Sequence, residues 1–468
     1  MERNIFEISR QDAERVLSEA LCNGGTYADL YFEHTITNEL VLRDNKISAV
    51  ASNIDFGVGV RVLKGERTGY AYSETTDMDS MLRAAKTAAQ IADSPTIKHK
   101  EIKISKEIKA GNHYPLIKGW DDTDVTYKIK YLNYLNEQIQ KRGLYVEKAN
   151  ARIADSISDI LFYNSHGETF YDIRPLVSIS AGAVMLKEGR RENGSVSRSF
   201  RCGFELLDES LMDEIADELI AKTEILFKAV QPKGGAMPVV MGAGGSGILL
   251  HEAVGHAFEA DFNRKGASIF SDKMGKKVCD SSINIVDDGT ILANRGSCNW
   301  DDEGIPGQKT YMVKDGILNS YLHDRISAHY YKLPPTGNGR RESFRYMPIP
   351  RMRATYMEAG PYSSDEIIKT VKKGIYVDNF SNGQVQIGAG DFTFFVKSGY
   401  LIEDGVLTAP IKDINIIGNG PQALSNITMV GNDPKMENAT WICGKDQLCP
   451  VSCGMPTVKV NQLMVGGV

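Results

Sequence analysis

The sequence has no long apolar run, no surplus of positive charge and few cysteines. None of its 468 residues lies in a stretch that approaches the roughly 18 apolar residues of a membrane-spanning helix. The formal net charge is -6 and no dense Lys/Arg cluster occurs, which argues against nucleic-acid binding. The segment before Arg10 is charged and lacks the apolar core of a signal peptide. We therefore expect a cytoplasmic protein that binds neither membranes nor nucleic acid.

Seven cysteines, an odd number at irregular spacing, do not predict a disulfide framework. The last three, Cys443, Cys449 and Cys453, form a C-x5-C-x3-C cluster whose spacing is not that of a zinc ribbon or knuckle. Most of the seven are expected to be small buried thiols. One of the last three could still complete a site whose other ligands lie elsewhere.

The length predicts two or three domains, and the patterning differs between the two halves. In the first half, helical spacing and period-two alternation predict helices over 10–21, 77–92, 124–141 and 209–229, and strands over 27–62 and 145–186. The charged, alternating stretch 97–109 is expected to be an exposed connector or an edge strand.

A turn-rich break at Gln231–Gly235 separates the halves. Beyond it, short strands and glycine turns with few helices predict a largely antiparallel sheet. We therefore predict an α+β protein with an N-terminal domain over 1–230, an α/β half of strands and helices. A C-terminal domain over 231–468 is mostly antiparallel sheet and carries the helix described next.

The most informative segment is His251-Glu252-Ala253-Val254-Gly255-His256. Two imidazoles around a carboxylate are typical of a zinc hydrolase, but H-E-x-x-H places its histidines four residues apart and here they are five apart. Five residues rotate the second histidine roughly 140° away on a regular helix, so both cannot face one ion. We predict a one-residue π-type insertion, which Gly255 would tolerate best.

Chemistry assigns roles within this motif. Neutral imidazoles of His251 and His256 would bind zinc, and Glu252 would act as general base on the metal-bound water. A catalytic zinc needs a third protein ligand, and the sequence leaves Glu259, Asp261 and a distant Cys or His open. The other histidines are expected to be surface or satisfied polar residues: His34, His99, His113, His166, His323 and His329.

A glycine-rich loop precedes the motif. Residues 242–247 (GAGGSG) follow a short apolar strand over 237–241 and formally match the G-x-G-x-x-G dinucleotide fingerprint. That fingerprint also needs a second strand with an acidic end about twenty residues on, and the sequence shows none. The loop is better suited to let another backbone, such as a substrate peptide, approach the helix start. A dinucleotide-dependent oxidoreductase is thus the alternative function.

The run GAGGSGILLHEAVGHAFEADFNR closely resembles the metal-binding segment of the TldD/PmbA family of peptidases, in its TldD-like branch that keeps H-E-x-x-x-H. Three further blocks are similar to the same family: 301–304 (DDEG) with the following PGQ, 413–433, and the tail from 442 to 468. The resemblance covers the C-terminal half, and the N-terminal half is similar in pattern.

The resemblance implies a zinc metallopeptidase in which His251, His256 and Cys443 bind one Zn2+ and Glu252 is the catalytic base. It implies peptide substrates, unfolded or short, bound in extended form in an interior channel of a dimer. The dimer is a homodimer or a heterodimer with a metal-free paralogue. A non-catalytic partner subunit is a second alternative, against which the intact motif argues.

The tail departs from the family pattern at Cys449 and Cys453, where small or apolar residues are typical. If Cys443 is the ligand, these two are bystanders. Their presence raises ligand exchange or redox inactivation as a hypothesis.

Overall fold

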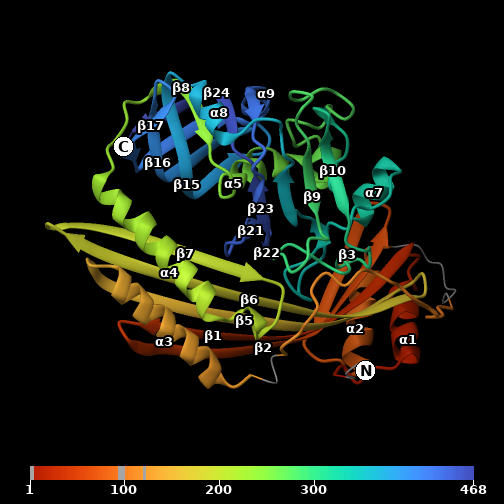
Figure 1. Cartoon of the computed structure of the whole chain (residues 1–468). Coiled ribbons are helices and arrows are strands. Elements are labelled where there is room, and N and C mark those ends of the chain that lie inside the picture. Colours follow the sequence, from red (N-terminus) through yellow and green to blue (C-terminus); the bar gives the residue numbers. More distant parts are fainter. Residues whose placement is uncertain (1–4, 93–100, 120–122, 468) are drawn as a thin grey trace.

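The computed structural model describes residues 5–92, 101–119 and 123–467. A long sheet built from the first half of the chain underlies a second half made of several smaller sheets (Figure 1). This mixture of helices and strands confirms the predicted α+β class. In the described ranges, no helix is both long and apolar enough to cross a membrane.

The N-terminal sheet has the strand order β3-β2-β1-β5-β6-β4, and β7 also pairs with β6. Its strands are β1 (Tyr27–Arg43), β2 (Lys46–Lys64), β3 (Arg67–Ser73), β4 (Lys106–Glu107), β5 (Val146–Asn164), β6 (Glu168–Lys187) and β7 (Arg190–Phe200). Every pairing is antiparallel except that of β4 with β6. β4 is an edge strand, one of the two alternatives predicted for 97–109; residues 97–100 lie outside the described residues.

Two pairs of helices pack on this sheet and confirm the predicted helices. They are α1 (Arg10–Ala20) with α2 (Met78–Ala89), and α3 (Val125–Arg142) with α4 (Glu209–Glu224). Each begins after a Ser or Asp whose side chain accepts a backbone N–H of the first turn, which supplies an otherwise unpaired donor with a partner. Each pair buries its apolar face in its own core, and the two cores lie at different ends of the sheet.

The C-terminal half contains a sheet of order β15-β8-β24-β18-β16-β17, with β19 beside β24. Its strands are β8 (Gly235–Met241), β15 (Lys373–Gln386), β16 (Asp391–Glu403), β17 (Val406–Ile411), β18 (Ile414–Asn419), β19 (Ile427–Val430) and β24 (Val458–Gly467). β15 also pairs with β16, so five of these strands close into a ring around an apolar core. Most of its pairings are antiparallel, as predicted.

A second C-terminal sheet has the order β11-β10-β9-β14-β23-β20, and two hairpins stand beside it. The strands of the sheet are β9 (Ile285–Asp288), β10 (Lys309–Lys314), β11 (Ile317–Leu318), β14 (Ala354–Met357), β20 (Lys435–Glu437) and β23 (Ser452–Met455). One hairpin consists of β12 (Gly339–Arg340) and β13 (Ile349–Pro350), and the other of β21 (Ile442–Lys445) and β22 (Gln447–Pro450). Short helices connect them: α5 (Gly247–Leu250), α6 (Ala260–Arg264), α7 (Arg325–Tyr331), α8 (Ser364–Lys369) and α9 (Gly420–Ser425).

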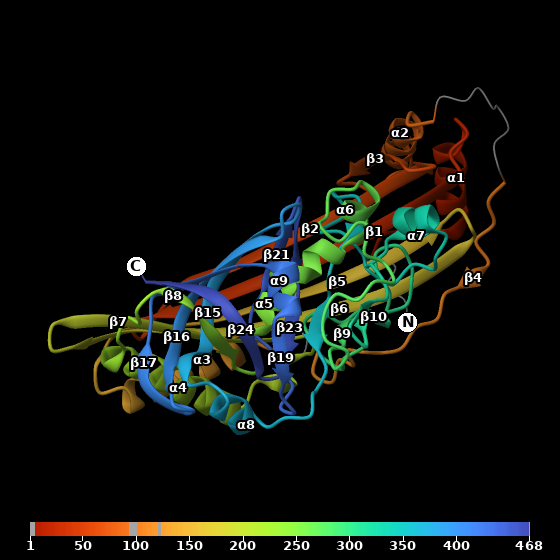
Figure 2. The same ribbon diagram turned by 90° about the horizontal axis from the view of Figure 1, so that it is seen from above.

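The two halves meet across buried ion pairs. Seen from above, the C-terminal elements lie over the long strands of the N-terminal sheet (Figure 2). Arg61 of β2 contacts Asp29 of β1, and its Nη1 lies 2.5 Å from Oε1 of Glu303 in the C-terminal half. All three side chains are fully buried. Removing one partner of such a group is strongly destabilising, because it leaves buried charge that is no longer fully compensated.

Replacing Arg61 with leucine should therefore destabilise the junction of the two halves. The expected loss in free energy of unfolding is about 3–5 kcal/mol, because Glu303 would remain buried without an ion-pair partner and Asp29 would keep only Arg341, at 3.6 Å. Denaturant unfolding followed by circular dichroism measures it. Arg191→Leu is the matched control, since it removes an exposed pair with Glu147 and should change little. Equal stability of the two variants would contradict the expectation.

Candidate metal centre

The segment between the two motif histidines is a π-helical turn. α5 passes directly into η3 (His251–Gly255), where the N–H of His256 bonds the carbonyl of His251, five residues back. This confirms the predicted insertion. The extra residue turns the second imidazole back toward the first, and the ring centroids lie 5.0 Å apart. The five-residue spacing is thus compatible with one shared site.

Gly255 is needed for space and not for unusual backbone angles. Its φ of -59° and ψ of -52° are ordinary helical values. A Cβ at this position would lie 2.2 Å from Sδ of Met352, far inside van der Waals contact. The expectation that Gly255 serves to tolerate distortion was therefore wrong in its reason, because it is close packing that requires glycine here.

Cys443 joins the two histidines from a distant part of the chain. Donor atoms of His251, His256 and Cys443 all lie within 4.8 Å of one another, and the three residues are buried. Cys443 Sγ is 3.2 Å from Nε2 of His256. Nδ1 of His251 is buried without a hydrogen-bond partner among the described residues. Two imidazoles and one thiol are the donors that a zinc ion prefers, so this group could hold one.

Glu259 orients a histidine and does not join the cluster of donor atoms. Its Oε2 lies 3.0 Å from Nδ1 of His256, the ring nitrogen that faces away from Cys443. A carboxylate on the second nitrogen fixes the ring and its tautomer, as is common behind metal-bound histidines. Asp261 instead contacts Lys445 at 2.8 Å. Of the third ligands that the sequence left open, the structure therefore favours a distant cysteine over either acid.

Lys445 ties the Cys443 hairpin to the histidine segment. Its Nζ lies 3.0 Å from Oε2 of Glu259, and both side chains are buried. Burial by itself would raise the pKa of Glu259, but the charges of Lys445 and then His256 lower that pKa to about 2. The carboxylate therefore stays ionised and remains an acceptor for the His256 ring.

The histidines favour the thiolate form of Cys443. Burial alone would raise the pKa of this thiol, but its electrostatic interactions and hydrogen bonds with His251 and then His256 lower its pKa to about 4. The thiolate is the form of cysteine that binds metals. Glu252 follows His251 in the turn and is half-buried, whereas His251 is fully enclosed. The side chain of this acid is therefore partly accessible to solvent.

Arg351 supports the hairpin from behind, although no local pattern in the sequence pointed to it. Its Nη2 donates to the carbonyl of Cys443 at 2.6 Å and its Nη1 to that of Gln447 at 2.8 Å. Its Nε lies 3.9 Å from Oε1 of Glu259, and the side chain is fully buried. One guanidinium thus fixes both strands of the hairpin relative to the acid behind His256.

Cys449 and Cys453 occupy different positions. Cys449 stands directly opposite Cys443 across the β21–β22 hairpin, whereas Cys453 lies in β23. Burial raises the pKa of Cys449 and also that of Cys453. All the cysteines are free thiols. The hypothesis of ligand exchange or redox inactivation through Cys449 and Cys453 stays a prediction.

The glycine loop serves packing within the chain. A Cβ on Gly247 would lie 2.4 Å from the backbone nitrogen of Gly454, and Gly244 has a φ of +91°. β8 is flanked by β15 in parallel and by β24 in antiparallel, and the following helix has four residues. This is not the strand-helix-strand unit of a dinucleotide site. Gly245 faces a cavity, so an approach of substrate is compatible with that position alone.

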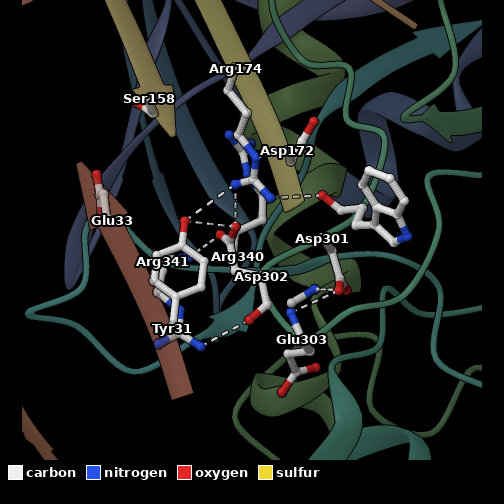
Figure 3. Close-up of polar contacts among 12 residues, drawn as sticks. Tyr31, Glu33, Ser158, Asp172, Arg174, Asp301, Asp302, Glu303, Arg340 and Arg341 are labelled. Atoms are coloured by element: carbon white, nitrogen blue, oxygen red, sulfur yellow. Dashed lines mark hydrogen bonds and ion pairs between the residues drawn. The ribbon is translucent and has the colours of Figure 1, made fainter. Parts of the chain in front are cut away.

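The block 301–304 lies at the junction of the halves. Asp302 accepts a hydrogen bond from Arg174 of β6, and Tyr31 of β1 points at the same carboxylate (Figure 3). Burial would raise the pKa of Asp302, but Arg174 and Arg341 lower it to about 2. This block thus joins the N-terminal sheet to the C-terminal half.

His323 departs from the expectation of a surface or satisfied polar residue. It is 1% exposed, and neither ring nitrogen has a partner among the described residues. Burial lowers its pKa to about 4, so the ring is neutral near pH 7. It packs edge-on against Tyr321 and Tyr331. His99 lies outside the described residues.

Family comparisons place the whole chain in one class. Models of the PmbA/TldA metallopeptidase domains match in order: domain 1 over 28–92, the central domain over 118–227 and the C-terminal domain over 234–467. The matched class is that of metallopeptidases. The chain belongs to the PmbA/TldD family.

Curated relatives agree over nearly their full length. A metalloprotease TldD homolog from Buchnera aphidicola is 37% identical, covering 99% of this chain and 97% of the relative. Another from Haemophilus influenzae is 38% identical, covering 94% and 93%. A zinc metalloprotease TldD homolog from Saccharolobus solfataricus is 27% identical, covering 95% and 97%.

Solved structures share the fold. TldE from Thermococcus kodakarensis has a TM-score of 0.74 at 19% identity, covering 97% of this chain and 100% of that one. A protein from Bacteroides thetaiotaomicron described as a putative modulator of DNA gyrase has a TM-score of 0.77 at 19% identity, covering 98% of each chain. At this identity the likeness concerns the fold alone.

Replacing either of two facing cysteines with alanine tests which thiol binds the metal. Cys443→Ala should lose bound zinc, because one of three clustered donors disappears. Cys449→Ala is the matched control, since it removes the facing thiol without touching the cluster, and it should keep zinc. Elemental analysis of the purified proteins, with circular dichroism to verify folding, measures both. The reverse order of zinc contents would assign the ligand to Cys449.

Proposed function

We propose that this protein is a zinc-dependent peptidase that hydrolyses unfolded or short peptides. The observation that carries the proposal is the approach of His251, His256 and Cys443 to within 4.8 Å, with Glu252 next in the same turn. Two imidazole nitrogens and one thiolate sulfur suit zinc and leave a fourth position for a water or a substrate. The name of the Saccharolobus relative supports zinc as the metal.

Glu252 is the acid-base residue of the proposed mechanism. Zinc, when bound, supplies Lewis acidity that makes a water easier to deprotonate and a carbonyl easier to attack. The carboxylate of Glu252 takes the proton of the attacking water and returns it to the leaving amine. Glu259 holds the ring of His256 through Nδ1, and Lys445 and Arg351 hold Glu259 and the Cys443 hairpin in place. These groups keep the donors fixed during the reaction.

An extended peptide fits the surroundings. β7 pairs with β6 on one side, and its residues 193–198 line a cavity of about 510 Å³ on the other. Gly245 lies just before the motif helix and Trp441 just before the Cys443 strand, and both line the same cavity. A free strand edge offers backbone donors and acceptors to an extended chain with little preference for side chains. This arrangement supports peptides in extended form as the substrate.

The proposed assembly is a dimer, either of two copies or with a metal-free paralogue. β3 pairs only with residues 58–64 of β2, and residues 46–54 of β2 form an exposed edge. Val50 is 68% exposed and Ile54 is 62% exposed on this segment. An edge with exposed apolar side chains is a site for pairing with another chain. We accordingly assign the N-terminal domain, residues 1–230, to the channel wall and the dimer contact, the peptidase centre to 231–468, and the protein to the cytoplasm.

Glu252→Gln tests the mechanism. Peptide hydrolysis should fall by about 10²–10⁴-fold, the usual contribution of a general base, while zinc content stays unchanged. A quenched fluorescent peptide of unstructured sequence reports the activity, and a chelator should abolish it in the unaltered protein. Glu147→Gln, at an exposed position on β5, is the control. Full hydrolysis by Glu252→Gln would remove the proposed mechanism.

The assembly is tested by light scattering on the purified protein. A homodimer should have about twice the 51.6 kDa mass of the chain. Val50→Lys with Ile54→Lys should lower that mass to the monomer, because charges would be buried without partners in the contact. If the protein alone is monomeric, mixing with a purified metal-free paralogue should give the dimer mass. A monomer under both conditions would contradict the proposal.

A further inference from the structure

A smaller cavity of about 200 Å³ lies between the N-terminal sheet and the C-terminal half. β1, β5 and β6 form one wall, including the hydroxyls of Thr35 and Ser158. The opposite wall comes from the C-terminal half, with Asp302, Arg340 and Arg341 among its residues (Figure 3). Because its lining is largely charged and hydroxylic, the cavity is suited to a polar ligand.

Three arginines of this cavity form no ion pair with a carboxylate, and two of them, Arg201 and Arg340, have a pKa that is lowered by burial. Arg201, Arg340 and Arg353 are 8%, 4% and 4% exposed, and none forms an ion pair with any described residue. Their side chains donate hydrogen bonds to backbone carbonyls. Arg201 donates to those of Arg295 and Pro175, Arg340 to those of Met352 and Pro450, and Arg353 to that of Gly337. A buried cation without a counterion is costly, so the site favours an anion.

The acids around the cavity are already engaged. Asp302 accepts from the guanidinium of Arg174 and from the backbone of Arg341. Glu33 accepts from the hydroxyl of Thr35 and the N–H of Phe344, and burial raises its pKa to about 7. Glu342 accepts from the N–H of Leu448. None of these carboxylates forms an ion pair with Arg201 or Arg340, whereas the charges of Asp301 and Asp302 act on Arg353.

The arginines also raise the positive potential at one another. Burial lowers the pKa of Arg340 to about 10, and the charges of Arg353 and Arg201 act in the same direction. Burial likewise lowers the pKa of Arg201. For Arg353 burial acts in the same direction, but the charges of Cys298, Asp301 and Asp302 raise its pKa overall, so this arginine is already compensated. At Arg201 and Arg340, a bound anion would relieve both the desolvation and the mutual repulsion.

The cavity adjoins the hairpin that carries Cys443. Arg340 Nη2 donates to the carbonyl of Pro450 at 2.7 Å, and Pro450 follows Cys449, which faces Cys443. The Cα atoms of facing residues such as Cys443 and Cys449 lie roughly 5 Å apart, and those of consecutive residues such as Cys449 and Pro450 about 3.8 Å apart. The guanidinium of Arg340, which contacts Pro450, is therefore on the order of 10 Å from Cys443. An extended peptide covers that distance in about three residues.

We propose that Arg201 and Arg340 bind the C-terminal carboxylate of the substrate peptide. This assignment rests on the proposed peptidase function and makes the enzyme release short C-terminal fragments. A terminal carboxylate provides two oxygens for guanidinium donors, which are geometrically matched to it. A side-chain carboxylate has the same chemistry, so the position of the charge along the peptide has to be tested.

The test compares one peptide in three forms with the unaltered zinc protein. The forms are a free C-terminal acid, a C-terminal amide, and an amide with a glutamate as its last residue. Amidation should lower kcat/KM by about tenfold to a hundredfold, the effect of losing a charge-assisted hydrogen bond. Mass spectrometry should show fragments of about three residues released from the free acid. Rescue by the glutamate peptide would overturn the terminal assignment.

Binding to the Glu252→Gln protein separates this inference from the peptidase proposal. Fluorescence anisotropy should show tighter binding of the free acid than of the amide, and Arg201→Gln should remove the difference. Arg191→Gln, remote on β7, should keep it. Absence of hydrolysis for every peptide would overturn the peptidase function, while the binding comparison would still decide the anion site. Equal binding of acid and amide overturns the inference.

Discussion

The backbone hydrogen bond from the N–H of His256 to the carbonyl of His251 is the contact on which the proposed metal centre depends. A regular helix would direct the two imidazoles to different sides. One π-turn shifts the second ring by a residue and brings the ring centroids to 5.0 Å. The turn is held by its surroundings, since Met352 packs against Gly255 where no Cβ fits. A π-turn is rare because it is unstable alone, and here packing stabilises it.

Buried charged side chains hold in place the metal-binding donor atoms that the turn brings together. Glu259 lies behind His256, and Lys445 and Arg351 connect this acid to the hairpin of Cys443. The histidine segment and the hairpin are nearly 190 residues apart in the chain. Opposite charges in a buried setting hold them together more precisely than apolar packing would, because hydrogen bonds are directional. Rigid support of this kind keeps metal ligands in position.

The same kind of interaction joins the halves of the molecule. Arg61 and Arg174 extend from the N-terminal sheet to acids of the 301–304 block. Next to these satisfied pairs, Arg201 and Arg340 have only backbone carbonyls as acceptors. The contrast between paired and unpaired cations within one buried region is what distinguishes a binding site from a structural network. The proposed site for the substrate carboxylate therefore lies at the contact between the halves, near the hairpin of Cys443.

Local patterns were enough to predict the helices with Ser or Asp caps, the long alternating strands, the α+β class and the π-turn, because each depends on neighbours within a few residues. The spacing of His251 and His256 even required the irregular turn. Cys443 could be assigned only by resemblance, and the positions of Glu259, Arg351 and the three cavity arginines followed from no local pattern. Their roles depend on strands that pair across the chain and on which charges become buried together. The sequence determined the chemistry available, and the tertiary structure decided which groups meet, because burial and distance set the strength of each interaction.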